Sequence, residues 1–344
     1  MAVYTDVSFD EAAALVRRLG IGELTALTGI TGGIENTNYF ADTTQGRYVL
    51  TLFERLEAAQ LPFYLGLMQH LAARGIPVPG PHADASGAIL HSVQGKLAAV
   101  VDRLPGRHNL APDAAHCASL GEVLARLHLA GQDFPLHQPN LRSLAWWTET
   151  VPVVLPFLSA EQAALIESEL AFQQQLAASP AYAALPQGAI HADLFRDNVM
   201  FDADERKAPA VDVEASEEVT PIGHAPGPDR LSGLMDFYFA GVDTYLFDIA
   251  VCLNDWCIDL ESGRLDEARA QALVAAYDGV RALTGGELRL MPALMRGAAL
   301  RFWISRLWDL HLPRDASQLT AHDPTHFERV LRERVTAPWH HTRA

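Results

Sequence analysis

The sequence predicts an α+β protein with two lobes, a small antiparallel sheet at the N-terminal end and a mainly helical C-terminal lobe. Turn signals divide the first hundred residues into short β-rich segments, whereas amphipathic helical patterns dominate the remainder. The chain has 344 residues, of which 49% are hydrophobic, enough for a core in each lobe. We therefore expect an N-terminal lobe over 1–102, a hinge over 103–107 and a helical lobe over 108–344.

The N-terminal lobe is expected to combine two helices with hairpin-linked strands. Ser8 precedes an acidic turn and an apolar helical pattern that stops at Gly20, as in a capped helix. A second helical pattern ends at Gly75. The strands are rich in Thr, Tyr, Val and Ile, and their turns are expected at 32–33, 45–46 and 94–95.

Beyond Leu104-Pro105-Gly106 the sequence becomes helical, and two short strands are expected around "AIHADLFRDNVMFD" and "LSGLMDFYFA". Between them, residues 203–230 are acidic, rich in proline and glycine, and without periodicity. This composition predicts an inserted mobile loop. A surface loop without function is the simplest interpretation of it.

The composition argues against several classes of protein. A formal net charge of −16 without a basic stripe disfavours nucleic acid and anionic membranes as partners. Only Lys96 and Lys207 are lysines, and no "GxxxxGK[ST]" motif occurs, so a P-loop is excluded. The three cysteines give no disulfide framework, and Cys252 and Cys257 suit helix packing better than a metal site. Without a signal pattern or an apolar membrane span, a cytoplasmic location is expected.

The residues of "HADLFRDN" suit phosphoryl transfer from ATP. Such a reaction needs a carboxylate that orients the acceptor hydroxyl, and hard oxygen ligands that hold Mg²⁺ on the phosphates. Asp193 is the candidate base, and Asn198, five residues later, can face the same centre. Asp236 ends an apolar strand and is the candidate second metal ligand. The alternatives are an ordinary Asx-rich turn at 193–198 and a strand-end cap at Asp236.

These motifs also resemble a known family. "HADLFRDN" followed by "MDFYFAGVDTYLFDIAVCLNDW" is similar to the aminoglycoside-phosphotransferase-like branch of the protein-kinase fold. "GIENTNYF", "YVLTLFE" and "LRFWISRLWD" resemble, within that branch, the bacterial homoserine kinases. The similarity runs from about Val3 to Asp309 and fails over 203–230. It implies a bilobal protein-kinase-like fold that uses ATP and Mg²⁺.

The resemblance implies roles for individual residues. Asp193 would be the catalytic aspartate, and Asn198 and Asp236 would hold Mg²⁺. His191 would brace the catalytic loop by hydrogen bonding, and Asp248 would support the same loop from a helix. Arg196 and Asp197 remain open between solvated side chains and, for Arg196, a phosphate contact. "TGGIENTNY" would cover the phosphates, unless it is a plain hairpin turn, and the adenine would be read near the hinge; the residues concerned are Gly32, Gly33, Asn36, Thr37, Val101 and Arg103.

One position departs from the family pattern. Thr51 stands on "YVLTLFE" where the resemblance leads us to expect the ATP-pairing lysine. Arg47 and Arg55 flank this strand and would share the face of Thr51 only if the strand stays regular. For the substrate, Arg301 and Arg306 are the candidate partners of a carboxylate, although Arg306 could instead pair with Asp309 on the surface.

The resulting expectation is an enzyme, monomeric or homodimeric, that phosphorylates the hydroxyl of L-homoserine with Mg²⁺–ATP in threonine biosynthesis. Choline, ethanolamine, methylthioribose or an aminoglycoside remain alternative acceptors. A catalytically silent nucleotide-binding protein is the alternative suggested by Thr51. A metal-dependent hydrolase built on His191 and Asp193 lacks a third ligand.

Overall fold

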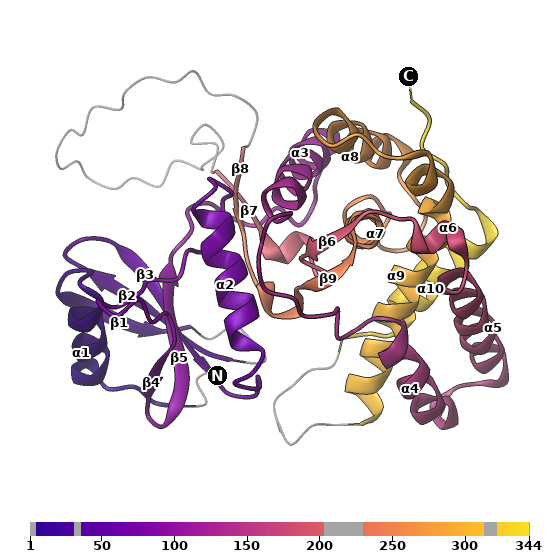
Figure 1. Ribbon diagram of the computed structural model, residues 1–344. Coiled ribbons are helices and arrows are strands. Elements are labelled where there is room, and N and C mark those ends of the chain that lie inside the picture. Colours follow the sequence, from indigo (N-terminus) through magenta and orange to yellow (C-terminus); the bar gives the residue numbers. More distant parts are fainter. Residues whose placement is uncertain (1–4, 31–35, 203–229, 313–321, 344) are drawn as a thin grey trace, which may run out of the picture.

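The computed structural model describes residues 5–30, 36–202, 230–312 and 322–343. A five-stranded antiparallel sheet lies at one end of the molecule and most helices lie at the other (Figure 1). The strand order is β1-β2-β3-β5-β4. The bounds are Leu24–Gly29 (β1), Asn36–Thr43 (β2), Arg47–Phe53 (β3), His91–Val93 (β4) and Lys96–Asp102 (β5). The predicted α+β class is confirmed, whereas the exact lobe boundaries remain predictions.

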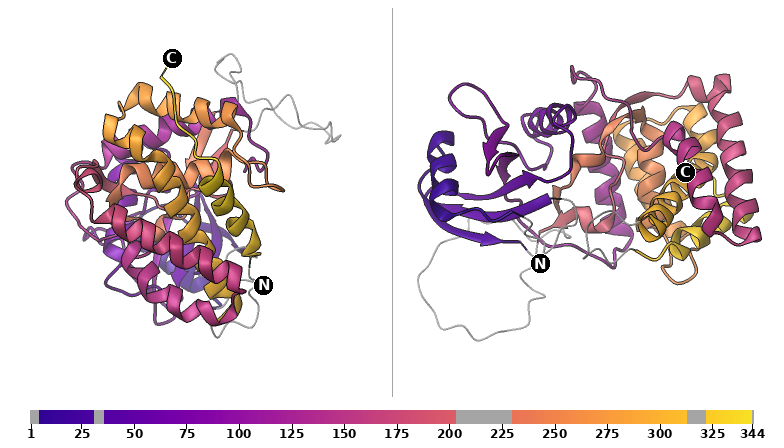
Figure 2. Two further views of the ribbon diagram at one scale, coloured as in Figure 1. Left: turned by 90° about the vertical axis from the view of Figure 1, so that its right-hand side faces the viewer. Right: turned by 90° about the horizontal axis from the view of Figure 1, so that it is seen from below.

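The predicted elements of the N-terminal end are present. The first helix, Phe9–Leu19 (α1), has a capping box between Ser8 and Glu11 and ends at Gly20 in the left-handed conformation. The second helix, Leu61–Ala72 (α2), lies on the side of the sheet that faces the helices of the C-terminal part (Figures 1 and 2). The strands meet through the expected turns at 45–46 and 94–95, whereas the turn at 32–33 lies outside the described residues.

The two faces of the five-stranded sheet have different neighbours. The outer face packs on α1 through a core that includes Leu52 and Ala98. The inner face carries Phe53 and Ala99, which belong to the same core as α2 and the C-terminal helices. Pairing between β2 and β3 is regular from Asp42↔Arg47 to Asn36↔Phe53. Because side chains alternate along a strand, this register decides which residues share a face.

The rest of the chain is mainly helical. Its most extensive helix–helix packing joins α3 to α8 and α7 to α9. The bounds are Ala114–Ala130 (α3), Leu144–Val154 (α4), Ala160–Ala177 (α5), Pro180–Ala183 (α6), Tyr245–Trp256 (α7), Glu267–Val280 (α8), Gly285–His311 (α9) and Thr325–Thr336 (α10), with short 3-10 turns at Leu155–Phe157 (η1), Arg196–Asn198 (η2) and Phe237–Phe239 (η3).

Two small antiparallel pairs carry the loops of interest. One joins Gln187–Ile190 (β6) to Gly241–Thr244 (β9), and the other joins Val199–Phe201 (β7) to Leu231–Leu234 (β8). The insertion predicted over 203–230 therefore lies between two strands, as expected, and these strands pair as the β7–β8 hairpin. At its base the amide of Asp202 donates to the carbonyl of Arg230 at 2.9 Å. The predicted mobility concerns residues 203–229, which lie outside the described residues.

The segment predicted as a hinge is attached to the β7–β8 hairpin. Arg107 forms a β-bridge with Phe201, and the Ser232 hydroxyl donates to the carbonyl of Pro105 at 2.8 Å. Gly106 has a φ of +105°, and a Cβ atom there would lie 2.4 Å from the Phe201 carbonyl oxygen. Only glycine fits both the backbone conformation and the space.

We expect Gly106→Ala to lower the melting temperature far more than Gly87→Ala. Gly87 also has a positive φ, +85°, but nothing lies within 4 Å of its added Cβ. The control therefore carries only the backbone cost of about 1–2 kcal/mol, while Gly106→Ala must also displace backbone atoms of β7. Differential scanning calorimetry of both variants measures the difference. Equal melting temperatures would contradict the close approach of the hinge to β7.

Two further expectations concern the whole chain. No helix in the described ranges combines the length and the apolar character that a membrane crossing requires. Cys117, Cys252 and Cys257 are buried free thiols, in line with a packing role for Cys252 and Cys257.

Candidate active site

The loop that contains "HADLFRDN" connects β6 to β7, and its first residues are fixed by a buried carboxylate. Asp248, on α7, accepts the backbone N–H of His191 and that of Ala192, each at 2.8 Å. Ala192 has a φ of +64°, which is uncommon for a residue with a side chain. Such strain persists where neighbouring contacts over-determine the backbone, and the two hydrogen bonds to Asp248 do so here.

Asp248 has a third donor that the sequence analysis missed. The Nε2 atom of His128, on α3, lies 3.1 Å from the Asp248 carboxylate, and its Nδ1 atom lies 2.6 Å from the hydroxyl of Tyr277. Burial holds the pKa of His128 below its usual value, so the ring is neutral. Burial alone would raise the pKa of Asp248, but the contacts with the His128 ring and with His191, including the hydrogen bond from its backbone amide, lower it overall. A histidine inside an apolar helix gives no sequence signal that distinguishes it from core packing.

His191 joins the catalytic loop to the segment that carries Asp236. Its Nε2 atom lies 2.8 Å from the carbonyl oxygen of Met235, and its Nδ1 atom is 3.3 Å from the amide of Asp193. The side chain is fully buried and packs on Phe237 at 4.5 Å. Burial lowers the pKa of His191. These contacts are those of a brace and would keep the ring neutral at pH 7.

Asp193, Asn198 and Asp236 are brought together by short-range contacts. The Asn198 side-chain nitrogen donates to the Asp193 carbonyl at 2.8 Å and lies 3.4 Å from its carboxylate. The Met235 amide donates to the Asn198 carbonyl at 2.9 Å, which places Asp236 beside the same loop. Asp236 is exposed and has a left-handed backbone, φ 63°. Since the Asn198 nitrogen is engaged with Asp193, its side-chain oxygen is the atom suited to bind a cation.

The two arginines predicted for the substrate lie on α9, on the side of Asp193. The guanidinium of Arg301 is 3.6 Å from the Asp193 carboxylate and lies over the ring of Phe302 at 3.7 Å. Arg306 donates to the Asp323 carbonyl at 3.0 Å and lies over Phe327 at 4.5 Å. Burial lowers the pKa of Arg306, and neighbouring carboxylates, Asp193 among them, oppose that shift.

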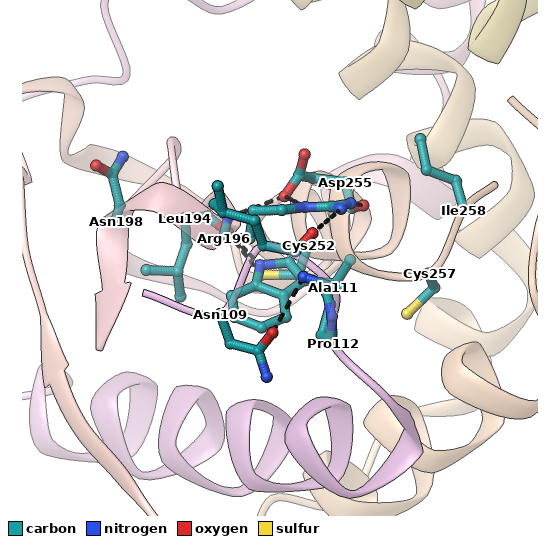
Figure 3. Close-up of polar contacts among 12 residues, drawn as sticks. Asn109, Ala111, Pro112, Leu194, Arg196, Asn198, Cys252, Asp255, Cys257 and Ile258 are labelled. Atoms are coloured by element: carbon teal, nitrogen blue, oxygen red, sulfur yellow. Dashed lines mark hydrogen bonds and ion pairs between the residues drawn. The ribbon is translucent and has the colours of Figure 1, made fainter. Parts of the chain in front are cut away.

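Arg196, whose role was left open, extends toward Asp255 on α7 (Figure 3). Its backbone amide and its Nε atom both donate to the Asp255 carboxylate, at 2.9 and 3.1 Å, and its Nη1 atom donates to the Leu110 carbonyl. Arg196 is 7% exposed. The side chain therefore anchors the loop and is not arranged as a phosphate contact, whereas its neighbour Asp197 is exposed.

On the inner face of the sheet, Thr51 is paired across the strands with Asn38. The Thr51 hydroxyl donates to the Asn38 side-chain oxygen at 2.7 Å. Asn36 lies two residues along β2 on the same face and is 7% exposed. Because β3 is regular, Arg47 shares this face but lies at the opposite end of the strand, and the exposed Arg55 follows the strand's end.

Thr37, one of the predicted phosphate contacts, is placed on the outer face instead. It pairs with Leu52, which packs on α1, and its hydroxyl donates to the Glu54 carboxylate at 2.6 Å. The same carboxylate contacts the ammonium of Lys96. The Thr37 side chain therefore does not contribute to the phosphate contacts proposed below. Gly32 and Gly33 lie outside the described residues.

The backbone near the hinge is partly occupied. The amide of Asp102 donates to the Gly80 carbonyl and that of Arg103 to the Arg47 carbonyl, each at 3.1 Å. Val101 is paired with Val49 and bridges to Pro81. The guanidinium of Arg103 lies over the Phe40 ring at 3.9 Å. Because these backbone amides already form hydrogen bonds within the protein, they are not free to bind the adenine. The backbone that follows Arg103 is better suited to that contact.

Among the described residues, no group of three His, Cys, Asp or Glu side chains is placed to hold a metal. A cation on ATP does not need such a group, because phosphate oxygens and water complete its coordination. One carboxylate, Asp236, and one amide oxygen, Asn198, form a hard-oxygen donor pair that fits Mg²⁺ in this setting.

We expect the free energy of unfolding to fall as the pH drops below about 6.5. His128 and His191 are fully buried with lowered pKa values, so the folded state keeps them neutral, whereas the unfolded chain binds protons near their usual pKa. Each contributes stability that is present above that pH and is lost below it, by up to about 1.4 kcal/mol per pH unit. Urea unfolding at pH 7.5, 6.5 and 5.5 measures the slope. The exposed His322 provides a control, since His322→Asn should leave the slope unchanged.

The chain is similar to proteins that carry out phosphoryl transfer. The model of the Phosphotransferase enzyme family, APH, matches residues 26–211 and 224–283. A protein named homoserine kinase from Polaromonas naphthalenivorans (strain CJ2) is 61% identical over 98% of this chain and 99% of its own length. Another, from Ralstonia nicotianae, is 53% identical over 98% and 96%.

Solved structures agree on the fold. A spectinomycin phosphotransferase in complex with ADP and spectinomycin aligns with a TM-score of 0.66, at 12% identity, over 97% of this chain and 99% of the other. A choline kinase from Cryptosporidium parvum Iowa II aligns with a TM-score of 0.59, at 12% identity, over 96% of each chain. These neighbours establish the architecture, and the near full-length relatives establish the branch. The chain belongs to the homoserine kinase branch of the APH phosphotransferase enzyme family.

Proposed function

We propose that the protein is an ATP-dependent homoserine kinase, which transfers the terminal phosphoryl group of ATP to the hydroxyl of L-homoserine. The observation that carries this proposal is the near full-length identity of 61% to a homoserine kinase. The arrangement of Asp193, Asn198 and Asp236 supports it, because these residues provide a base and a cation-binding pair side by side. The product would enter threonine biosynthesis.

In this proposal, Asp193 orients the acceptor hydroxyl and accepts its proton. Phosphoryl transfer depends on positioning and on charge stabilisation, so the fixed loop matters as much as the carboxylate itself. His191 and Asp248 act through the backbone by holding the loop in place. The Arg301 guanidinium beside Asp193 stabilises negative charge in the same region.

Asn198 and Asp236 would hold Mg²⁺ through their side-chain oxygens. When bound, the ion would neutralise phosphate charge, since the described strands carry no lysine on the inner face of the sheet. Asn36, Asn38 and Thr51 provide neutral polar groups on that face for the nucleotide. The adenine would meet the chain at the predicted hinge, just beyond Arg103.

For the acceptor, we propose that Arg301 and Arg306 take the carboxylate of the amino acid. Both lie on α9 and interact electrostatically with Asp193, so a substrate held by them would bring a hydroxyl toward that carboxylate. Arginine is suited to this task because its planar fork matches a carboxylate. An acceptor without a carboxylate, such as choline, would offer the two arginines no negatively charged partner.

An acceptor panel tests the assignment. ADP release would be measured with L-homoserine, choline, ethanolamine, methylthioribose and an aminoglycoside, and homoserine is expected to give by far the highest kcat/KM. 3-Amino-1-propanol keeps the amine and the hydroxyl but lacks the carboxylate, and 2-aminobutyrate lacks the hydroxyl. The first should be a poor substrate and the second an inhibitor without turnover. Faster turnover of any other acceptor would overturn the assignment.

A further inference from the structure

Three phenylalanine rings lie together beside the loop that carries Asp193. Phe195 belongs to that loop, Phe302 to α9 and Phe327 to α10, and these two helices pack against each other. The ring centroids of Phe195 and Phe302 are 4.4 Å apart. Those of Phe302 and Phe327 are 5.1 Å apart, and those of Phe195 and Phe327 are 5.8 Å apart. Such spacings are those of favourable aromatic pairs. The three rings are here called the aromatic platform.

The platform is attached to the catalytic loop through Phe195. The Phe195 amide donates to the carbonyl of Asp193, and its own carbonyl accepts from the amide of Asn198, each at 2.9 Å. A shift of the ring would therefore move the backbone that joins the candidate base to the candidate cation ligand. Because the ring packs on the other two platform rings, α9 and α10 fix this part of the loop, whereas Asp248 fixes its first residues.

The two arginines proposed for the acceptor lie on rings of the platform. The Cζ atom of Arg301 is 3.7 Å from the centre of the Phe302 ring, and that of Arg306 is 4.5 Å from the centre of the Phe327 ring. A further ring, Phe239, lies 5.1 Å from Arg301. All these distances are within the range of about 6 Å for cation–π contacts. A guanidinium that lies on a ring through its face presents N–H groups at its edge, where a carboxylate can bind.

The helix alone would not direct both arginines to one ligand. Arg301 and Arg306 are five residues apart on α9, so their positions differ by about 140° around the helix axis and by about 7.5 Å along it. The rings of Phe302 and Phe327 connect the two guanidinium groups, because each ring contacts one of them and the rings contact each other. Arg301 also lies 3.6 Å from the Asp193 carboxylate. Both cations are thus joined to the catalytic loop through the platform.

We propose that the aromatic platform fixes the guanidinium groups of Arg301 and Arg306 relative to Asp193, and so selects acceptors that carry a carboxylate. The three phenylalanines are positioning residues, since they act on the acceptor through the two arginines. The inference rests on the proposed function, in which these arginines take the carboxylate of the amino acid. It names the part of the site that distinguishes an amino acid from an amino alcohol.

The test replaces platform rings by leucine, which keeps an apolar side chain without an aromatic face. In Phe302→Leu and Phe327→Leu, the KM for L-homoserine should rise about two- to thirtyfold, the range of one cation–π contact. The KM for ATP should not change. The ratio of kcat/KM for homoserine to that for 3-amino-1-propanol should fall by the same factor, because the amino alcohol offers no carboxylate. Steady-state kinetics with both acceptors measures these values.

Phe195→Leu is a second variant, which replaces a partly buried ring and so disturbs the core less. It should reduce the preference for homoserine and also lower kcat, since the Phe195 backbone is hydrogen-bonded to Asp193 and Asn198. Phe195→Tyr keeps the ring and should restore both values. A loss of folded protein alone would reduce the amount of active enzyme but would leave the preference between the two acceptors unchanged.

Phe172→Leu is the matched control. The Phe172 ring lies 3.7 Å from the guanidinium of Arg296, which is also on α9, and this is the distance between Arg301 and the Phe302 ring. Arg296 pairs with Glu169 on α5, outside the catalytic loop. The variant therefore loses an equivalent contact at another place. It should keep both the KM for homoserine and the preference for homoserine over 3-amino-1-propanol.

The possible outcomes separate this inference from the assignment of the acceptor. If the unchanged protein prefers homoserine in the acceptor panel, an unaltered preference in the leucine variants, or an equal fall in Phe172→Leu, would overturn the inference and leave the proposed function standing. If another acceptor proves best, the proposed function fails. The inference then stands only if that acceptor carries a carboxylate and the leucine variants lose their preference for it over its counterpart without the carboxylate. A best acceptor that lacks a carboxylate would overturn both.

Discussion

Asp193→Asn is expected to lower kcat by roughly 10²- to 10⁴-fold, the contribution of a positioned general base. Asparagine has nearly the same shape but cannot accept the proton of the acceptor hydroxyl. The loop should persist, because it is held by Asp248 through His191 and Ala192 rather than by the side chain of residue 193. The KM for ATP should therefore change little, which would assign the loss to the chemical step.

Asp197→Asn is the matched control for this experiment. Asp197 belongs to the same loop, but its side chain is exposed. The hydrogen bond that joins Asn198 to Asp193 does not involve it. Steady-state kinetics of both variants at saturating homoserine and ATP should show near-normal kcat for Asp197→Asn alone. Near-normal kcat in Asp193→Asn would remove Asp193 from the reaction.

Asp248→Asn is expected to reduce both stability and activity. The carboxylate accepts hydrogen bonds from three buried donors, two backbone amides and the His128 ring. An amide offers one acceptor oxygen and would turn its NH₂ group toward at least one of these donors. Leaving a buried donor without its charged partner costs about 3 kcal/mol. The catalytic loop would then shift, and a displacement of about 1 Å can cost roughly 10²-fold in rate.

Asp243→Asn is the control for this experiment. It shows how much of the effect comes from removing a buried carboxylate in general and how much from releasing the catalytic loop. Asp243 accepts from Asn140 and from the Thr244 amide, and burial raises its pKa, so a neutral replacement is tolerated better there. Thermal unfolding and kcat per folded molecule should both fall further in Asp248→Asn than in Asp243→Asn. Equal effects would show that Asp248 has no special connection to the loop.

Local sequence signals were sufficient for most of the N-terminal elements. Ser8 and Glu11 mark a capping box that forms as expected, and the glycines at 46 and 95 sit in the turns between paired strands. The insertion over 203–230 was also expected between two short strands, and the strands on either side of it pair as the β7–β8 hairpin. These features depend on residues close in sequence, where chemistry and geometry are coupled directly.

Side-chain direction and long-range contacts could not be read in the same way. Thr37 and Asn36 are neighbours in sequence, yet strand register sends only Asn36 to the inner face. Arg196 looked equally suited to solvent or phosphate until Asp255, 59 residues away, was found beside it. His128 is connected to the loop through Asp248, 120 residues away. Such roles follow from contacts between segments far apart in the chain, which no local sequence pattern reveals.

The position of Lys96 has a consequence for chemical probes of this enzyme. Its ammonium contacts Glu54, and β-strand alternation places both on the outer face of the sheet with α1. Nucleotide analogues that label kinases by acylating an amine next to the bound phosphates would find no lysine on the inner face of the described strands. We expect the enzyme to escape such labelling while it still turns over ATP. For the same reason, inhibitors that depend on an amine that pairs with phosphate should bind this enzyme weakly. Ligands designed for it would have to bind the amide and hydroxyl side chains of the inner face instead.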